Sequence, residues 1–346
     1  MSLSTRLIVV LVVSVQVFSS LAGPSTPRDK DLRNDIKKDE IDLTSDSSIN
    51  EEPSREEQDC LRFLVQNMPV TDHMSLRYTF LHNQAHYALK ARADNPWASV
   101  VPWDIFLNNV LPYANLDEPR EDWRTSFYEL FSPLVTNTAS TLDAATALNY
   151  QIWTLGDWNI SFKAGQTPDI MSPSQVLSHG YASCTGLAIF FVDACRAVGI
   201  PARVAGIAEW TETGGNHNWV EVWHNGVWSF TEPLGFPNRP WNQTWFFPDP
   251  VRRAKLHSYA HGIYAASFQH TGHLFPLAWH DEYESTVPGY EVTKYYLDAA
   301  VEADPVMALD GDDAVSVAVG QVGGPGPDVA QPIANDGGKE EEELIA

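Results

Sequence analysis

Apolar side chains recur every three or four positions through the first half of the chain, and this spacing predicts a run of helices. The pattern covers residues 57–93, with Thr71 and Asp72 as candidate N-caps. Short helices punctuated by prolines are expected after it. A last helix is expected over residues 141–153, with a cap at Ser140.

One segment in the middle of the chain is apolar nearly all round. Residues 187–192 form an uninterrupted apolar run, which predicts a buried core helix of about fifteen residues. Ser183 is suited to cap the start of this helix, and Gly199, with Pro201 soon after it, is suited to end it. A strand is expected directly afterwards, over residues 200–207.

Two runs of aromatic and β-branched residues flank Asn225-Gly226, a dipeptide typical of a two-residue hairpin turn. If His224 faces Val227, the remaining register follows, and alternate residues share one face. The expected pairs are Trp223 with Trp228, Glu221 with Phe230, Trp219 with Glu232, and His217 with Leu234. His217 and Glu232 then become diagonal neighbours on one face of the hairpin.

The region after this hairpin is expected to complete a sheet with strands over residues 264–268 and 274–279. His270 and His273 have a spacing found in metal sites, but the tight set of further ligands that zinc requires is lacking. Asp310-Gly-Asp-Asp313 likewise lacks the ligand spacing of a calcium loop. The sequence therefore predicts no metal.

Composition and charge narrow the classes of function. The chain has 346 residues, of which 44% are hydrophobic, so it can bury a large core. Its formal net charge of −23 has the wrong sign for a surface that binds nucleic acid. Much of this charge lies near the ends, so residues 23–58 are expected to be a disordered linker or pro-segment, and residues 301–346 an acidic disordered tail.

The N-terminus is organised like a secretory signal peptide over residues 1–22. Arg6 precedes the apolar run Leu7–Val17, and small residues stand before an expected cut after Ala22. The run is shorter than the roughly 20 apolar residues that cross a bilayer, and an uncleaved anchor is the alternative. We expect a secreted protein, or one in the lumen of the secretory pathway, with no membrane attachment after cleavage. Asn159 and Asn242 match the glycosylation acceptor pattern of that route.

The chain has three cysteines, too few for a disulfide scaffold. Cys184 and Cys195 lie eleven residues apart on one predicted helix, or about 16 Å, so they cannot bond to each other. Cys195 is expected to be a small core side chain. Cys184 is expected in the first helical turn, where free N–H groups and the helix dipole favour a thiolate.

Cys184, His217 and Glu232 together suit nucleophilic acyl chemistry. The expected folding places a thiol at a helix start, an imidazole on a strand and a carboxylate beside that imidazole. In such a set the base takes the thiol proton, the carboxylate fixes the imidazole tautomer, and the substrate carbonyl passes through an oxyanion.

These motifs resemble the core of the transglutaminase-like superfamily, a branch of the papain-like cysteine enzymes. The segments that carry the resemblance are Ser183-Cys184-Thr-Gly, Val198-Gly-Ile-Pro-Ala-Arg203, Asn216-His217-Asn-Trp-Val-Glu-Val-Trp223, Trp228 and Glu232-Pro233. Pro96-Trp97 and residues 106–113 resemble a helical extension found in a subset of that superfamily. The resemblance implies an α+β fold: a papain-like transglutaminase core, with a central helix packed on an antiparallel sheet, preceded by a helical region.

The resemblance also implies a catalytic triad of Cys184, His217 and Glu232. Many members of the superfamily have Asp at the third position, so Glu221 remains a rival to Glu232. A second oxyanion donor should come from an upstream Trp or Gln side chain. The candidates are Gln151, Trp153, Trp158 and Gln166.

The expected organisation is a signal peptide over 1–22, a linker over 23–58, a helical region over 59–153, a transglutaminase-like core over 154–300 and a tail over 301–346. The expected function is that of a thiol enzyme without cofactor, which attacks amide bonds of a protein or peptide substrate. Its thioester would be resolved by an amine or by water. A catalytically inactive module that binds peptide or glycan is the alternative.

Overall fold

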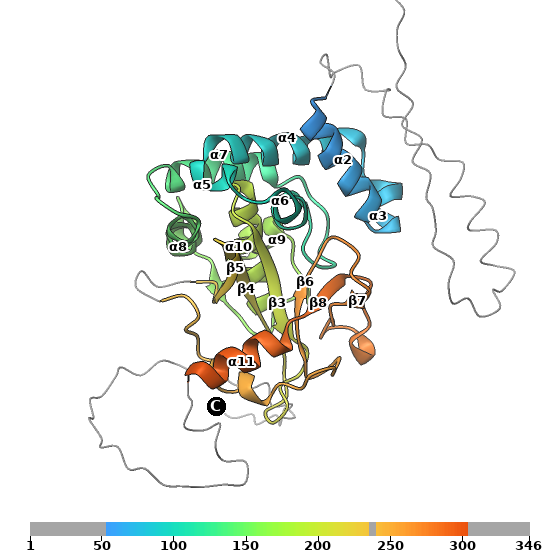
Figure 1. The fold of residues 1–346 in the computed structure, drawn as a ribbon, viewed down its shortest axis with the longest axis vertical. Coiled ribbons are helices and arrows are strands. Elements are labelled where there is room, and N and C mark those ends of the chain that lie inside the picture. The colour runs from blue at the N-terminus through green and yellow to red at the C-terminus, as the bar shows by residue number, and fades with distance from the viewer. Residues whose placement is uncertain (1–52, 235–239, 304–346) are drawn as a thin grey trace, which may run out of the picture. The chain divides into compact units, whose positions relative to one another are not determined.

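The aromatic and β-branched runs of the second half pair into one six-stranded sheet (Figure 1). Its strands are β3 (Ala202–Ile207), β4 (His217–His224), β5 (Val227–Thr231), β6 (Ile263–Ala266), β7 (His273–Leu274) and β8 (Pro288–Glu291). They lie in the order β5-β4-β3-β6-β8-β7, and all neighbouring pairs are antiparallel. A separate parallel pair joins β1 (Ser161–Phe162) to β2 (Tyr181–Ala182). This computed structural model describes residues 53–234 and 240–303.

Helices account for most of the chain before the sheet. They are α2 (Arg55–Asn67), α3 (Val70–Ser75), α4 (Tyr78–Asp94), α5 (Pro96–Ser99), α6 (Trp103–Asn109), α7 (Arg124–Val135), α8 (Thr141–Gln151), α9 (Pro173–His179) and α10 (Cys184–Ala197), with α11 (Thr293–Ala303) after the sheet. Short 3₁₀ turns are η1 (Ile152–Thr154), η2 (Val251–Arg253) and η3 (Asp281–Tyr283). The fold is thus a mixed one, with a helical N-terminal region and an antiparallel sheet.

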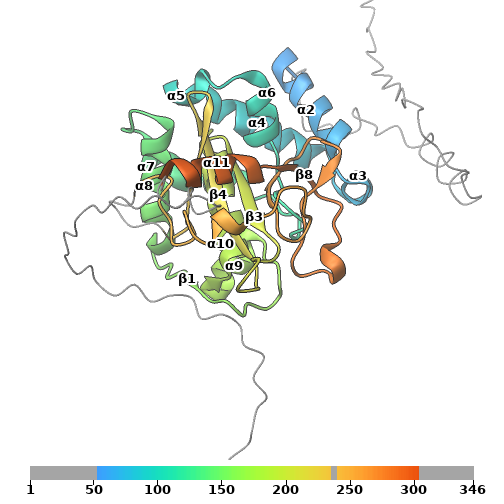
Figure 2. The same ribbon diagram turned by 60° about the horizontal axis from the view of Figure 1, so that its bottom comes forward.

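The two faces of the sheet are covered by different helices (Figure 2). Helix α10 packs with α7 and α8 into a core that includes Val204 and Val220. Helix α11 contributes Tyr296 to a second cluster that contains Ala205 and Trp219. Because neighbouring residues of a strand point to opposite faces, the two helices lie on opposite sides of β3 and β4.

The stretch over residues 57–93 is helical, as predicted, and consists of three helices, α2, α3 and α4. Pro69 occupies the N-cap position of α3 without a side-chain capping bond, so Thr71 and Asp72 lie inside the helix and are not N-caps. Helix α2 begins at Arg55, inside the segment expected to be disordered, because Ser54 and Glu57 form a reciprocal capping box. Ser140 does cap α8, as predicted.

The predicted hairpin register is confirmed from His224–Val227 through Glu221–Phe230. The ladder ends at Val220–Thr231, so the outermost expected pairs, those of Trp219 and His217, do not form. The strand expected over 274–279 is also wrong. Strand β7 ends at Leu274, where Phe275 and Leu277 turn into the core.

Several expectations fall outside the described residues: the signal peptide, nearly all of the charged linker, the acidic tail from residue 304 and its Asp310–Asp313 motif. Within residues 53–234 and 240–303, no helix combines the length and apolar character needed to cross a membrane.

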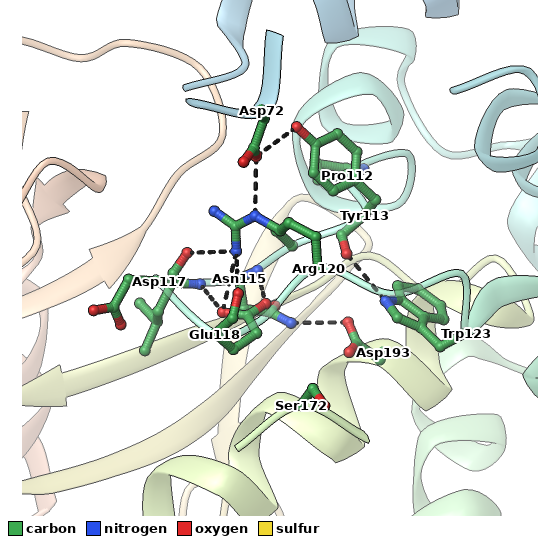
Figure 3. A network of polar contacts seen from close by, with 12 residues as sticks. Asp72, Pro112, Tyr113, Asn115, Asp117, Glu118, Arg120, Trp123, Ser172 and Asp193 are labelled. Atoms are coloured by element: carbon green, nitrogen blue, oxygen red, sulfur yellow. Dashed lines mark hydrogen bonds and ion pairs between the residues drawn. The ribbon is translucent and has the colours of Figure 1, made fainter. Parts of the chain in front are cut away.

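A buried polar network ties the helical region to α10 (Figure 3). Its hydrogen bonds run from Tyr113 and Arg120 to Asp72, from the backbone N–H groups of Asn115 and Leu116 to Glu118, and from the Asn115 amide to Asp193. Asp193 lies on α10, and it is fully buried. The segment between α6 and α7 therefore fixes the helix on which Cys184 stands.

A second buried polar group, the guanidinium of Arg124 on α7, also connects the helical region to α10. It donates to five acceptors: the Gln84 side chain and the backbone carbonyls of Val110, Leu111, Pro112 and Arg196. Burial lowers the pKa of Arg124 to about 9, and the charge of Arg196 acts in the same direction. The group remains charged at neutral pH.

We expect the Arg124→Leu variant to lose about 3 kcal/mol or more of its free energy of unfolding, because buried carbonyls are left without donors. Urea unfolding followed by tryptophan fluorescence measures this loss. Arg62→Leu is the control, because Arg62 is a partly exposed helix residue whose ion pair with Asp59 is open to solvent. The control should cost under about 1 kcal/mol. Equal losses in the two variants would contradict the prediction.

Candidate active site

Cys184 stands at the first position of α10. Ser183 has an extended backbone (φ −71°, ψ 176°), which ends the preceding segment and lets the helix begin at Cys184. Its side chain makes no capping bond, although the sequence suggested one as an N-cap. The Gln166 side chain accepts the Ser183 N–H instead. The half-buried Cys184 thiol therefore lies at the positive end of the helix dipole.

The hairpin brings an imidazole and a carboxylate together. His217 is the first residue of β4 and is buried, while Glu232 follows the last residue of β5. His217 Nε2 lies 2.8 Å from Glu232 Oε1. His217 and Glu232 are thus neighbours, as the hairpin register predicts, although the last β5 residue paired with β4 is Thr231, one residue before Glu232.

The thiol completes a chain of three groups. His217 lies beside the Cys184 thiol, whose pKa it lowers through a hydrogen bond and its charge. Because Nε2 of His217 is bonded to Glu232, Nδ1 is the ring nitrogen left for the sulfur. The backbone N–H of Asn218 also lowers the pKa of the thiol. Residues from a helix, a strand and the end of the next strand therefore meet at one point.

The pKa values of the thiol and the imidazole shift toward an ion pair. Burial raises the pKa of Cys184, but the hydrogen bond and charge of His217 outweigh it, and the pKa falls below its ordinary value of 9.0. Burial lowers the pKa of His217, but the charge of Glu232 and the bond to Cys184 outweigh it and raise the pKa to about 10. These shifts favour a thiolate next to an imidazolium.

Glu221, the rival carboxylate, is engaged elsewhere. It is fully buried, and its Oε2 lies 2.6 Å from Arg203 Nε. Its Oε1 accepts a hydrogen bond from Tyr296 at 2.7 Å, and Tyr296 in turn accepts one from Trp219 at 2.6 Å. Glu221 thus ties α11 to the sheet, while Glu232 is the carboxylate that meets His217.

Aromatic rings surround the imidazole. The ring centroid of His217 lies 5.1 Å from that of Trp245, 5.3 Å from Phe246 and 5.8 Å from Trp219. Trp219 and Phe246 are buried, but Trp245 is 48% exposed. A hollow of about 550 Å³ adjoins Trp245 and is lined by residues of 242–248 together with Ala303. The sequence did not single out Phe246, because it lies in a proline-rich loop.

Three of the four expected oxyanion donors are instead hydrogen-bonded to backbone carbonyls. The Gln166 amide donates to the carbonyls of Pro168 and Asp169, at 3.0 and 2.7 Å. Gln151 and Trp153 each donate to a backbone carbonyl one helical turn earlier. The remaining candidate, Trp158, packs its half-buried ring against aromatic core residues. Trp158 is therefore the candidate, among these four, whose N–H is not used in such a bond.

A hydrogen bond between Thr185 and Asn218 was not predicted from the sequence. Strand alternation indicated it, because Asn218 follows His217 and its side chain must point to the opposite face of β4, toward α10. There its amide meets the Thr185 hydroxyl at 2.7 Å.

The histidines, asparagines and other cysteines that the sequence singled out do not belong to the group formed by Cys184, His217 and Glu232. His270 and His273 are exposed, and in the described part of the chain no three His, Cys, Asp or Glu side chains are arranged to hold a metal. Asn159 is exposed, whereas Asn242 is half-buried, with its side-chain oxygen accepting the Phe230 N–H at 2.9 Å. Cys195 is buried and free, as is Cys60.

Comparison with known proteins finds a family similarity for part of the chain. Residues 129–233 match the family model of the transglutaminase-like superfamily, and this range contains Cys184, His217 and Glu232. Among solved structures, a "Putative Cysteine Protease" from Cytophaga hutchinsonii is similar, with 19% identity and a TM-score of 0.31. The match covers 40% of this chain and only 45% of that one. No curated protein matches the sequence.

Proposed function

Since residues 129–233 form a transglutaminase-like core, we propose that the protein is a cysteine-dependent enzyme that transfers acyl groups from amides. Cys184 acts as the nucleophile, His217 as the general base and acid, and Glu232 as the group that orients His217. The acyl acceptor is an amine or water.

The reaction begins from the thiolate–imidazolium pair, in which the Cys184 proton already resides on His217. The thiolate attacks the amide carbonyl carbon, a C–S bond forms, and the carbonyl oxygen becomes an oxyanion near the N-terminus of α10. Collapse breaks the C–N bond, and His217 donates its proton to the departing nitrogen. An amine or water, deprotonated by His217, then attacks the thioester and releases the thiol.

The single observation that carries this proposal is the meeting of Cys184, at the start of α10, with His217, whose Nε2 lies 2.8 Å from Glu232 Oε1. Burial instead raises the pKa of the other two thiols, that of Cys60 to about 12 and that of Cys195 well above its ordinary value. Cys184 alone among the three has a base within hydrogen-bonding contact. An inert binding module has no need of such a pair.

A protein or peptide amide is the proposed substrate class. The half-exposed Trp245 offers an apolar surface beside His217, on which a substrate side chain can pack. The leader-like N-terminus supports action in the secretory pathway or outside the cell.

The test incubates the purified protein with a glutamine-containing peptide and a fluorescent primary amine, and follows the products by mass spectrometry. The Cys184→Ser variant is the matched control, because it differs by one atom. Amine incorporation that the control lacks supports acyl transfer to amines, whereas glutamate formed without incorporated amine, or peptide fragments, supports hydrolysis, since ammonia leaves a glutamine side chain in both cases. If wild type gives no product and iodoacetamide fails to label Cys184, the binding-module alternative holds.

A further inference from the structure

We propose that Thr185 and Asn218 are positioning residues that hold the Cys184 thiol against His217. This inference rests on the proposed function, because it concerns the geometry of the same pair. It assigns neither side chain a part in bond making.

A buried hydrogen bond connects the two residues. Asn218 Nδ2 donates to Thr185 Oγ1 at 2.7 Å, and the exposed fractions of the residues are 3% and 2%. Thr185 follows Cys184 in the first turn of α10, and Asn218 follows His217 at the start of β4. The bond therefore joins helix and strand directly beside the thiol and the imidazole.

Two electrostatic influences act at the same point. His217 and the backbone N–H of Asn218 both lower the pKa of the Cys184 thiol. The Thr185–Asn218 bond thus links the dipeptide Cys184-Thr185 to the dipeptide His217-Asn218 directly beside the groups that polarise the thiol. A shift of the helix start relative to the strand strains this bond, which keeps the reacting groups in register.

Gly206 provides the space that the Asn218 side chain requires. Gly206 lies opposite Asn218 in the β3–β4 ladder. A Cβ atom at residue 206 would stand 2.0 Å from Asn218 Oδ1 and 2.9 Å from the His217 carbonyl oxygen. Because these distances are far below van der Waals contact, any larger residue at 206 displaces the amide that reaches Thr185.

A bond with a purely structural role would change stability alone, so the test follows the reactivity of the thiol. Thr185→Val keeps the shape of the side chain and removes the acceptor, whereas Thr185→Ser restores a hydroxyl. Thr293→Val is the matched control, because the Thr293 hydroxyl is fully buried and accepts the Ile263 N–H at 2.9 Å, on a different helix. The measurement is the rate at which iodoacetamide alkylates Cys184 as a function of pH, with the melting temperature recorded in parallel.

We expect Thr185→Val to slow alkylation at about pH 6 by roughly tenfold and to move the midpoint of the pH profile upward. Thr185→Ser should react within about threefold of wild type. Thr293→Val should lower the melting temperature and leave the profile unchanged. If Thr185→Val does not fold, Thr185→Ala takes its place in the same comparison.

A Thr185→Val profile that coincides with that of wild type overturns the proposal, as does an equal shift in Thr293→Val. Loss of the proposed function is read separately, from peptide turnover. If the Thr185→Val alkylation profile shifts but wild type turns over no peptide, the positioning role is supported and the acyl-transfer function fails. If wild type turns over peptide but the Thr185→Val profile does not shift, the acyl-transfer function is supported and the positioning role fails.

Discussion

The Cys184→Ala variant is expected to lose amide turnover by about 10⁴-fold or more, because no other group can form the thioester. Iodoacetamide at about pH 6 should label wild type once, at Cys184, and leave this variant unlabelled, since an ordinary thiol is almost wholly protonated at that pH. Product analysis gives the first quantity, and peptide mapping after alkylation gives the second.

Cys195→Ala is the matched control for this loss. Cys195 lies on the same helix and is also free, but it is fully buried in the core. We expect this variant to keep turnover within about threefold and to be labelled like wild type, with only a small loss of stability. Labelling at Cys60 or Cys195 in place of Cys184 would contradict the assignment of the nucleophile.

The His217→Ala variant is expected to slow alkylation of Cys184 at about pH 6 by as much as roughly 1,000-fold, because a thiol with the ordinary pKa of 9.0 is only about 0.1% thiolate at that pH. The direction of the shift follows from the electrostatic effect of His217 on the thiol. His217 lowers the pKa of Cys184, so removing it moves the rise of the alkylation profile to higher pH. The pH dependence of the alkylation rate, followed by mass spectrometry, measures this shift.

A loss of turnover is expected at high pH as well. The pKa of His217 stands at about 10, so the imidazolium that protonates the leaving nitrogen disappears as the pH rises through that value. Turnover should therefore rise as Cys184 ionises and fall again toward about pH 10.

Two carboxylate variants separate Glu232 from its rival. Glu232→Gln keeps a side chain of the same size but removes the charge that raises the pKa of His217, so alkylation should slow at low pH. Glu221→Gln leaves the buried Arg203 without its partner and should mainly lower the free energy of unfolding. A shifted alkylation profile in Glu221→Gln alone would reverse the two assignments.

The local signals of the sequence were sufficient for the elements that carry the site. Asn225-Gly226 defines a hairpin register, because a two-residue turn leaves one pairing for the flanking strands. The apolar run after Cys184 defines a core helix that starts at the thiol. The exact start of α3 was harder to predict, since Thr71 and Asp72 are favourable N-cap residues, yet the helix begins at Val70 with Pro69 at its N-cap position.

Sequence by itself therefore determined that Cys184 stands at a helix start and His217 on a hairpin strand, because those elements follow from periodicity, turn chemistry and helix ends. Only the tertiary structure shows which of the two carboxylates, Glu232 or Glu221, contacts His217, because both lie near it on the hairpin. Packing of α11 brings Tyr296 to Glu221, and Arg203 pairs with it across the sheet. The bond between Thr185 and Asn218 was likewise decided by packing, since contacts between residues far apart in the chain depend on how the elements meet.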